Sequence, residues 1–306
     1  MFQFKPFHFK FIPRMWWFIS LSTLVVGGSI FLMATKGLNL GTDFKGGIKL
    51  QYRSSRPIQE GDLRRLIEPL NAGDFSVQKI GKPEENRVVI KVEGMDRPEE
   101  TADNISQAFR SGLGEATLTL EQQETVGPKA GADMRRKAQL AIIVSWLLML
   151  IYIGYRFDFA FAPGAIVALV HDCLITLGAF ALSGREISLT VVAALLTIVG
   201  YSVNDTIVIY DRIRENLAKT QKFNLRELIN TSINETFSRT IITNLTVLMV
   251  VVLIYIFGEG EFQNFGFAMV VGAFAGTYST IYIASPCYIL LKEYGPRIRR
   301  LFGRKA

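Results

Sequence analysis

Six long apolar runs constrain this chain more than any other feature of its sequence. The runs cover residues 15–35, 138–155, 159–182, 187–210, 240–257 and 265–291. A transmembrane helix needs about 20 predominantly apolar residues to cross the hydrocarbon core, and a soluble protein of this length would not carry several such runs. The sequence therefore predicts an α-helical membrane protein with six spans.

The distribution of lysine and arginine predicts on which side of the membrane each connection lies. The short basic segments are 1–14, 211–239 and 292–306, and such segments stay in the cytoplasm. Six spans with both termini in the cytoplasm satisfy this rule and leave 36–137 outside. The net charge of +7 therefore reflects topology and does not predict a nucleic-acid partner. A cleaved signal peptide is the alternative for the first run, but its length and the lack of a clear cleavage site favour an uncleaved anchor.

The polar segment 36–137 has the size and pattern of a small domain. Apolar and polar residues alternate around Val88, Ile90 and Val92, as in a half-buried strand. The expected strands are 48–53, 75–80, 87–93 and 116–125, and the expected helices are 58–70 and 98–113. The order βαββαβ predicts an extracytoplasmic α+β domain of ferredoxin-like type between the first and second spans.

The fourth run ends in Asn204 and Asp205, an amide and a carboxylate where a span should hold only hydrocarbon. An ionisable group there costs roughly 2.5–3.5 kcal/mol on insertion scales, so it indicates a functional site. Arg239 begins the fifth span at a similar depth and is a candidate partner that would hold the carboxylate ionised. In the competing interpretations, Asp205 only fixes helix register and Arg239 only extends to the membrane surface.

His171 and Asp172 form a second polar pair near the middle of the third span. Gly164, Ala168, Asp172 and Thr176 recur every four residues, which predicts a face of small residues against another helix. A role in proton transfer and a purely structural role are both compatible with this pattern.

The sequence gives no support for enzymatic chemistry. It contains no nucleophile triad, nucleotide-binding loop or binuclear metal spacing, and Cys173 and Cys287 lie inside apolar runs. Gly46 and Gly47 indicate a turn and not a phosphate-binding loop. We therefore expect no enzyme activity, no cofactor and no metal, with protons as the coupling ion.

Three segments, together with the His171–Asp172 pair, resemble the SecF family. These are the six-span subunits of the bacterial SecDF protein-export complex, which belongs to the resistance-nodulation-division (RND) type of proton-driven transporters. The segments are GLNLGTDFKGG at 37–47, DTIVIYDRIREN at 205–216 and NETFSRT at 234–240. The similarity covers essentially the whole chain.

The resemblance implies an RND-type half bundle that uses the proton motive force to help a preprotein complete its passage through the Sec channel. It implies SecD, the SecYEG channel, YajC and an unfolded preprotein as partners, in the bacterial cytoplasmic (inner) membrane. It places Asp205 and Arg239 on the proton path. It also makes Asp43, Gly46 and Gly47 a hinge support where the first span meets the outer domain. Asn204 and the His171–Asp172 pair are further candidates for the path.

Two other functions stay open at this stage. One is an RND-type proton-driven exporter of small molecules or lipids, for which an outer region of about a hundred residues is small. The other is a purely structural assembly subunit, which would tolerate substitution of Asp205 and Arg239.

Overall fold

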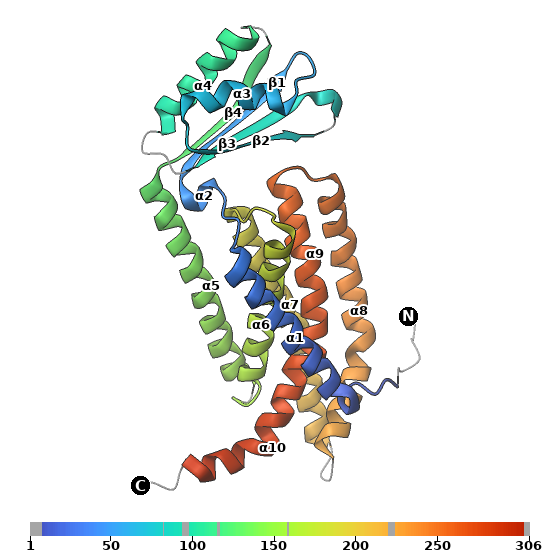
Figure 1. Cartoon of the computed structure of the whole chain (residues 1–306). Helices are drawn as coiled ribbons and strands as arrows, with labels where there is room; N and C mark the ends of the chain where they lie inside the picture. Colours follow the sequence, from blue (N-terminus) through green and yellow to red (C-terminus); the bar gives the residue numbers. More distant parts are fainter. Residues whose placement is uncertain are drawn as a thin grey trace.

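The computed structural model describes residues 8–81, 83–93, 98–114, 117–157, 159–219 and 224–302. A bundle of long helices carries a small sheet domain at one end (Figure 1). Within the described chain, six helices are long and apolar enough to cross a membrane. The predicted fold class, six spans with one α+β domain between the first and second, is confirmed.

The first five spans are single helices, and the sixth contains a π-helical turn. The first is preceded by a short 3-10 turn, η1 (Ile12–Arg14). The spans are α1 (Met15–Lys36), α5 (Pro128–Arg156), α6 (Ala162–Ser183), α7 (Leu189–Lys219), α8 (Leu225–Phe257), and the series α9 (Glu261–Ser279), η4 (Thr280–Ala284) and α10 (Ser285–Phe302).

Several helices are longer than their apolar runs, because backbone hydrogen bonding does not end where polar residues begin. Helix α5 starts at Pro128, inside the segment expected to belong to the outer domain, and α7 extends to Lys219. Most of the described part of 211–239 is therefore helix. Glu215 holds this extension by accepting from Arg212 and Lys219, each at 2.6 Å. Parts of the expected N-terminal segment, of this link and of the C-terminal tail lie outside the described residues.

The π-helical turn interrupts the sixth span, which the sequence analysis treated as one uniform run. Pro286 follows it and has no N–H to donate to the preceding turn. The hydroxyl of Ser285 donates to the carbonyl of Thr280 at 3.0 Å, and the hydroxyl of Tyr210 on α7 donates to the carbonyl of Ala284 at 3.2 Å. Turns of this type recur at functional sites, and this one lies beside α7.

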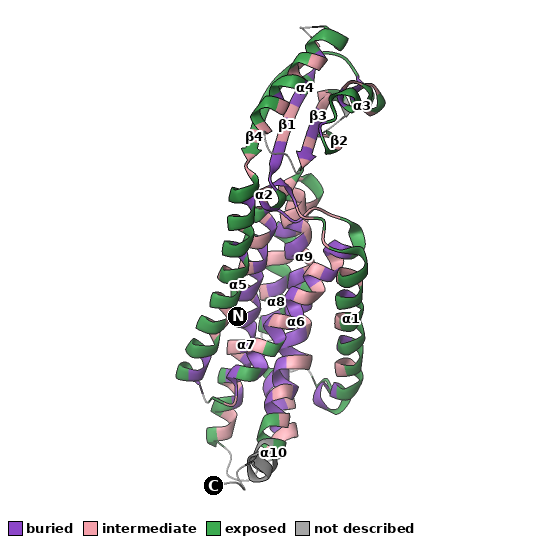
Figure 2. Ribbon diagram, turned by 60° about the vertical axis from the view of Figure 1, so that its left-hand side comes forward, coloured by how far each residue is buried: buried purple, intermediate pink, exposed green. Residues whose placement is uncertain are grey.

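The bundle has an inner and an outer set of helices (Figure 2). In the most apolar stretch of α6, α7 and the sixth span, 56% of the residues are buried, against 11–17% in α1, α5 and α8. Helices α7 and α9 approach closely, since a Cβ added at Gly272 would lie within 2.5 Å of Ile198. The inner helices therefore pack mainly on protein, whereas the outer ones expose apolar side chains to their surroundings.

The outer domain has the predicted βαββαβ order, and the strand order β2-β3-β1-β4 is antiparallel throughout. Its elements are β1 (Gly47–Ser54), α3 (Glu60–Ile67), β2 (Asp74–Ile80), β3 (Arg87–Glu93), α4 (Pro98–Leu113) and β4 (Leu118–Val126). Short 3-10 turns, η2 (Glu68–Leu70) and η3 (Pro83–Glu85), follow α3 and β2. The expected first residues of the fourth strand include 116, which lies outside the described residues.

The two faces of this sheet have different contacts. Helices α3 and α4 cover one face, where Ile48, Leu50 and Ile90 are fully buried. The alternate residues of β1 and β3, including Lys49 and Lys91, point to the other face, toward the bundle. A short helix, α2 (Thr42–Lys45), connects α1 to β1 at this junction.

Candidate functional site

Asp205 lies inside the bundle on α7 and is 4% exposed. Within the described chain its carboxylate accepts one side-chain hydrogen bond, from Nδ2 of Asn244 to Oδ2 at 2.6 Å. The oxygen of the same amide accepts from the hydroxyl of Tyr201 at 2.6 Å. A buried carboxylate usually has an ion-pair partner or several donors. A single neutral donor compensates the negative charge of Asp205 only weakly.

The expected ion pair between Asp205 and Arg239 is not formed between these described residues. Arg239 is exposed, and its charge acts on Asp205 through space. Asn244 lies five residues after Arg239 on α8, and five residues rotate an α-helix by about 140°. The face that carries Asn244, and not the face that carries Arg239, therefore lies beside the carboxylate. Arg239 thus begins the fifth span as predicted, but it lies on a face of α8 that does not contact Asp205. A shared role on a proton path stays a prediction.

Asp172 on α6 is fully enclosed, with 0% exposure. The hydroxyls of Ser202 on α7 and Ser279 on α9 donate to its Oδ2 at 2.7 and 2.9 Å. Its Oδ1 lies 3.0 Å from Nδ1 of His171. Asp172 therefore connects the three inner helices, and the predicted face of small residues places it at their centre.

His171 continues this network to the outer helix α1. Its Nε2 lies 3.2 Å from the hydroxyl of Ser22, which donates to the hydroxyl of Tyr278 on α9 at 3.0 Å. Tyr278 in turn donates to the backbone carbonyl of Phe18 at 2.5 Å. The sequence analysis missed Ser22, Ser279 and Tyr278, although polar residues inside otherwise apolar runs were the available signal.

Asn204 points away from Asp205. It is exposed on α7 and lines an apolar groove of about 390 Å³ with residues of α5 that include Met149 and Tyr152. No hydrogen bond to its side chain occurs among the described residues. The structure therefore does not bring Asn204 and the carboxylate together into one polar site.

Asp43, in the short helix α2 between α1 and the sheet, is bonded to the start of α7. Its Oδ2 accepts from the backbone N–H of Leu189, the first residue of that helix, at 2.8 Å. Such N–H groups have no partner within the helix, and a carboxylate there also interacts favourably with the helix dipole. The segment around it is held by backbone bonds between Gly41 and Ile187 and between Ile187 and Asn39, at 2.9 and 2.8 Å. The motif predicted to support a hinge thus contacts the helix that carries Asp205.

Gly46 and Gly47 permit a close approach of three chain segments. Both have positive φ, 78° and 149°. A Cβ at Gly46 would lie 2.7 Å from Cα of Pro128, and one at Gly47 would lie 2.1 Å from the carbonyl oxygen of Val92. Only glycine therefore fits between the start of α5 and the end of β3.

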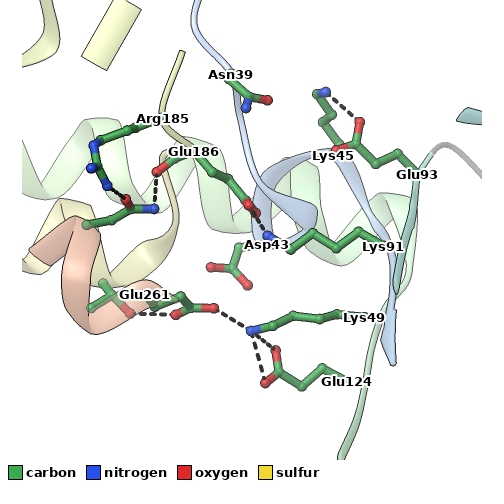
Figure 3. Close-up of polar contacts among 12 residues, drawn as sticks. Asn39, Asp43, Lys45, Lys49, Lys91, Glu93, Glu124, Arg185, Glu186 and Glu261 are labelled. Carbon is green, nitrogen blue, oxygen red and sulfur yellow. Dashed lines mark hydrogen bonds and ion pairs between the residues drawn. The ribbon is translucent and has the colours of Figure 1, made fainter. Parts of the chain in front are cut away.

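Ion pairs hold the sheet on the outer loops of the bundle (Figure 3). Lys91 pairs with Glu186 in the link between α6 and α7. Lys49 pairs with Glu261 at the start of α9 at 2.7 Å and with Glu124 at 3.4 Å. Asn264, in the first turn of α9, donates to the backbone carbonyl of Glu186 at 3.1 Å and joins this helix to the link between α6 and α7. A polar cavity of about 990 Å³ separates the rest of the sheet from these loops.

The raised pKa of Lys49 is consistent with ion pairs that persist at physiological pH. Burial by itself would lower the pKa of Lys49, but Glu261 and Glu124 raise it above its ordinary value of 10.5. A raised folded-state pKa gives a contribution to stability that is complete below the ordinary value and is lost as the pH rises through the raised one. The sequence analysis missed these pairs, because only the docking of the sheet brings strand lysines to loop carboxylates.

The comparison with known families identifies most of the chain. Residues 107–294 match the family described as protein export membrane protein SecD/SecF, C-terminal, and residues 31–58 match the SecD/SecF GG motif. The chain belongs to the SecD/SecF family of protein-export membrane proteins. The second match contains Asp43, Gly46 and Gly47, and the first contains Asp172, Asp205 and Arg239.

Individual relatives place the chain on the SecF side of this family. It is 43% identical over 287 residues to the protein translocase subunit SecF of Calditerrivibrio nitroreducens, covering 92% of this chain and 93% of the relative. It is 40% identical over 295 residues to SecF of Magnetococcus marinus, covering 96% and 94%. These relatives are translocase subunits, so the comparisons do not favour the alternative of a small-molecule exporter.

Solved structures show the same fold. The crystal structure of SecDF from Thermus thermophilus, described as a translocon-associated membrane protein, has a TM-score of 0.81 and 34% sequence identity over 93% of this chain. SecDF in a super-membrane-facing form has a TM-score of 0.71 and 33% identity. The SecF-family chain spans 39% and 41% of those two chains.

Proposed function

We propose that this SecF-family chain forms a complex with a SecD subunit and uses the proton motive force to promote late steps of preprotein translocation and release. The observation that carries the proposal is the position of Asp205. Among the described residues it is a buried carboxylate with one neutral side-chain donor, on a helix whose outer end is bonded to the segment that leads into the outer domain.

Protonation of Asp205 is the proposed input. In the ionised state Oδ2 accepts from Asn244, and Arg239 contributes attraction through space. A proton arriving from outside neutralises the carboxylate, which weakens both interactions and releases α7 from α8. One charge crossing the membrane field is worth about 2.3 kcal/mol per 100 mV, enough to bias a two-state arrangement of the helices.

Helix α7 is the proposed route from the proton site to the outer domain. It is continuous from Leu189 to Asp205, about 24 Å at 1.5 Å per residue. Its first N–H is bonded to Asp43, which lies just before β1, and the link preceding it carries Glu186, the partner of Lys91. A shift of α7 would therefore move the sheet, which we propose holds and releases an unfolded preprotein.

The proposed setting is the bacterial inner membrane with both termini in the cytoplasm. The short basic segments at the two ends and between α7 and α8 support this orientation, because such segments stay in the cytoplasm. In this orientation the sheet domain lies outside. The likeness to SecDF supports SecD as the partner. We propose SecYEG as the channel served, YajC as an accessory partner and protons as the coupling ion, with no enzymatic step.

Replacement of Asp205 by Asn is the decisive experiment. The amide keeps the size of the side chain but cannot take up a proton, so we expect assembly with SecD and loss of proton-dependent export. Late translocation of a preprotein would be followed in membrane vesicles carrying the complex, first with the membrane potential intact and then with it collapsed by an uncoupler. We expect the variant to export at the slow rate that the unaltered complex shows after collapse.

Asp211→Asn is the matched control. Asp211 lies on the same helix, is exposed, and pairs with Arg214, so its variant should export normally and still respond to the uncoupler. Normal, uncoupler-sensitive export by Asp205→Asn would show that the carboxylate is structural and that coupling lies elsewhere.

A further inference from the structure

A chain of hydrogen bonds joins α1, α6 and α9 through side chains that the mechanism above does not use. It runs from the carbonyl of Phe18 through Tyr278, Ser22 and His171 to Asp172. Ser22, His171 and Asp172 are all buried. Because each hydroxyl has a single proton to donate, the contacts determine in which direction each bond runs.

The carbonyl of Phe18, at one end of this series of hydrogen bonds, determines which group donates in each of them. A carbonyl oxygen only accepts, so Tyr278 uses its proton on Phe18. Ser22 must then donate to the oxygen of Tyr278, which uses its only proton. The remaining contact, between Ser22 and His171, therefore requires a proton on Nε2 of the histidine.

A second proton must lie between Nδ1 of His171 and Oδ1 of Asp172, since two unprotonated acceptors 3.0 Å apart would repel. It belongs either to an imidazolium facing a carboxylate or to a carboxylic acid facing a neutral ring. Both arrangements hold the same number of protons and have no net charge. The hydroxyls of Ser202 and Ser279 both donate to Oδ2, which favours the carboxylate and hence the imidazolium.

We propose that His171 and Asp172 form a proton-loaded pair, a second proton-binding site of the bundle, and that proton release reverses the hydrogen bond of Ser22. After release, the one ring proton lies on Nδ1 toward the carboxylate, and Nε2 becomes an acceptor. Ser22 then donates to His171 and no longer to Tyr278. The proton passes to water. The bond between α1 and α6 reverses its direction, and α1 loses the bond that Ser22 donates to α9.

Side chains from four other helices surround the His171–Asp172 pair on α6. Helix α1 contributes Ser22, α7 contributes Ser202, and α9 contributes Ser279 and the titratable Tyr278. Helix α5 contributes Trp146 beside Cys173, the titratable neighbour on α6 itself. Asp205, on α7, is bonded to Asn244 on α8. Among the described residues no lysine or arginine forms an ion pair with Asp172. Within the described chain, a protonated His171 is therefore the cation that would balance an ionised Asp172.

The proton count can be measured directly, because the sequence has only two histidines, His8 and His171. The full chain carrying His8→Gln would be labelled with ¹⁵N-histidine and studied by solid-state NMR in lipid bilayers at neutral pH. We expect two protonated ring nitrogens. A ring protonated only on Nε2, with an infrared band of a protonated carboxyl that Asp172→Asn removes, also supports the proposal. A neutral ring protonated on Nδ1 with a bare Nε2 would overturn it.

Tyr278→Phe tests the reversal of Ser22. Without the tyrosine oxygen, Ser22 is free to donate to His171, so we expect the ring signals to shift toward the neutral form protonated on Nδ1 at the same pH. Tyr282→Phe is the matched control, because Tyr282 lies one turn later and stacks on Phe18 with ring centroids 3.8 Å apart. Unchanged signals in Tyr278→Phe would contradict the proposed direction of the hydrogen bonds.

Discussion

Asp172 and Asp205 lie on neighbouring helices of one bundle and are both almost fully buried, yet their surroundings differ in kind. Asp172 has two hydroxyl donors and a histidine, drawn from three helices. Among the described residues, Asp205 has one side-chain donor, an amide from α8. Burial alone therefore does not determine how a carboxylate responds to a change of charge. The number and charge of its partners decide how much the structure must rearrange when the charge changes.

The largest expected effect is the loss of stability in Asp172→Ala. Removal of the carboxylate leaves Ser202, Ser279 and His171 without their partner, and breaking a buried pair costs about 3–5 kcal/mol. Asp205→Ala should cost about 1–3 kcal/mol, because it leaves one amide donor unsatisfied. Thermal unfolding of the two purified variants in the same detergent would measure the difference. Equal losses of stability would show that the additional partners of Asp172 do not make its removal more costly than that of Asp205.

Asn244→Ala should produce the next largest effect. It removes the amide that donates to Asp205 and accepts from Tyr201. We therefore expect a loss of about 1–3 kcal/mol together with reduced proton-dependent export. Thr246→Ala is the control, since Thr246 is exposed on the same helix. Full export by Asn244→Ala would show that Asp205 does not need this donor.

Asp43→Ala tests whether the outer domain shares in the function of Asp205. Loss of an acceptor at a helix N-terminus costs roughly 0.5–2 kcal/mol. We expect faster hydrogen exchange at the amide of Leu189 and weaker coupling of export to the proton motive force. Asp43→Asn retains an acceptor oxygen and should restore the protection of that amide. Unchanged exchange in the alanine variant would exclude Asp43 as a link to α7.

Of these variants, Asn204→Ala should change the stability of the protein least. Asn204 is exposed and does not bond to Asp205, and substitutions at such positions usually change stability by less than about 0.5 kcal/mol. The same thermal unfolding measurement checks this value. A loss as large as that of Asn244→Ala would mean that both residues belong to one polar site.

The six spans, the βαββαβ order of the outer domain and the residues worth testing were all predictable from the amino-acid sequence. Apolar length and strand alternation are local properties, so they could be read without the fold. Asp205 and Asp172 were recognisable because a carboxylate in an apolar run is costly wherever the helices lie. Gly46 and Gly47 were recognisable as a turn, although not as the contact with α5 and β3.

The contacts between side chains of different helices could not be predicted in this way. The face of α8 that carries Asn244 turns toward Asp205 because α7 and α8 pack at a particular rotation, which the depth of Arg239 in the sequence could not reveal. The bonds of Asp172 to Ser202 and Ser279, and of Asp43 to Leu189, join residues from distant parts of the chain. Helix rotation and sheet docking depend on how all the surfaces pack together, and no local pattern contains that information.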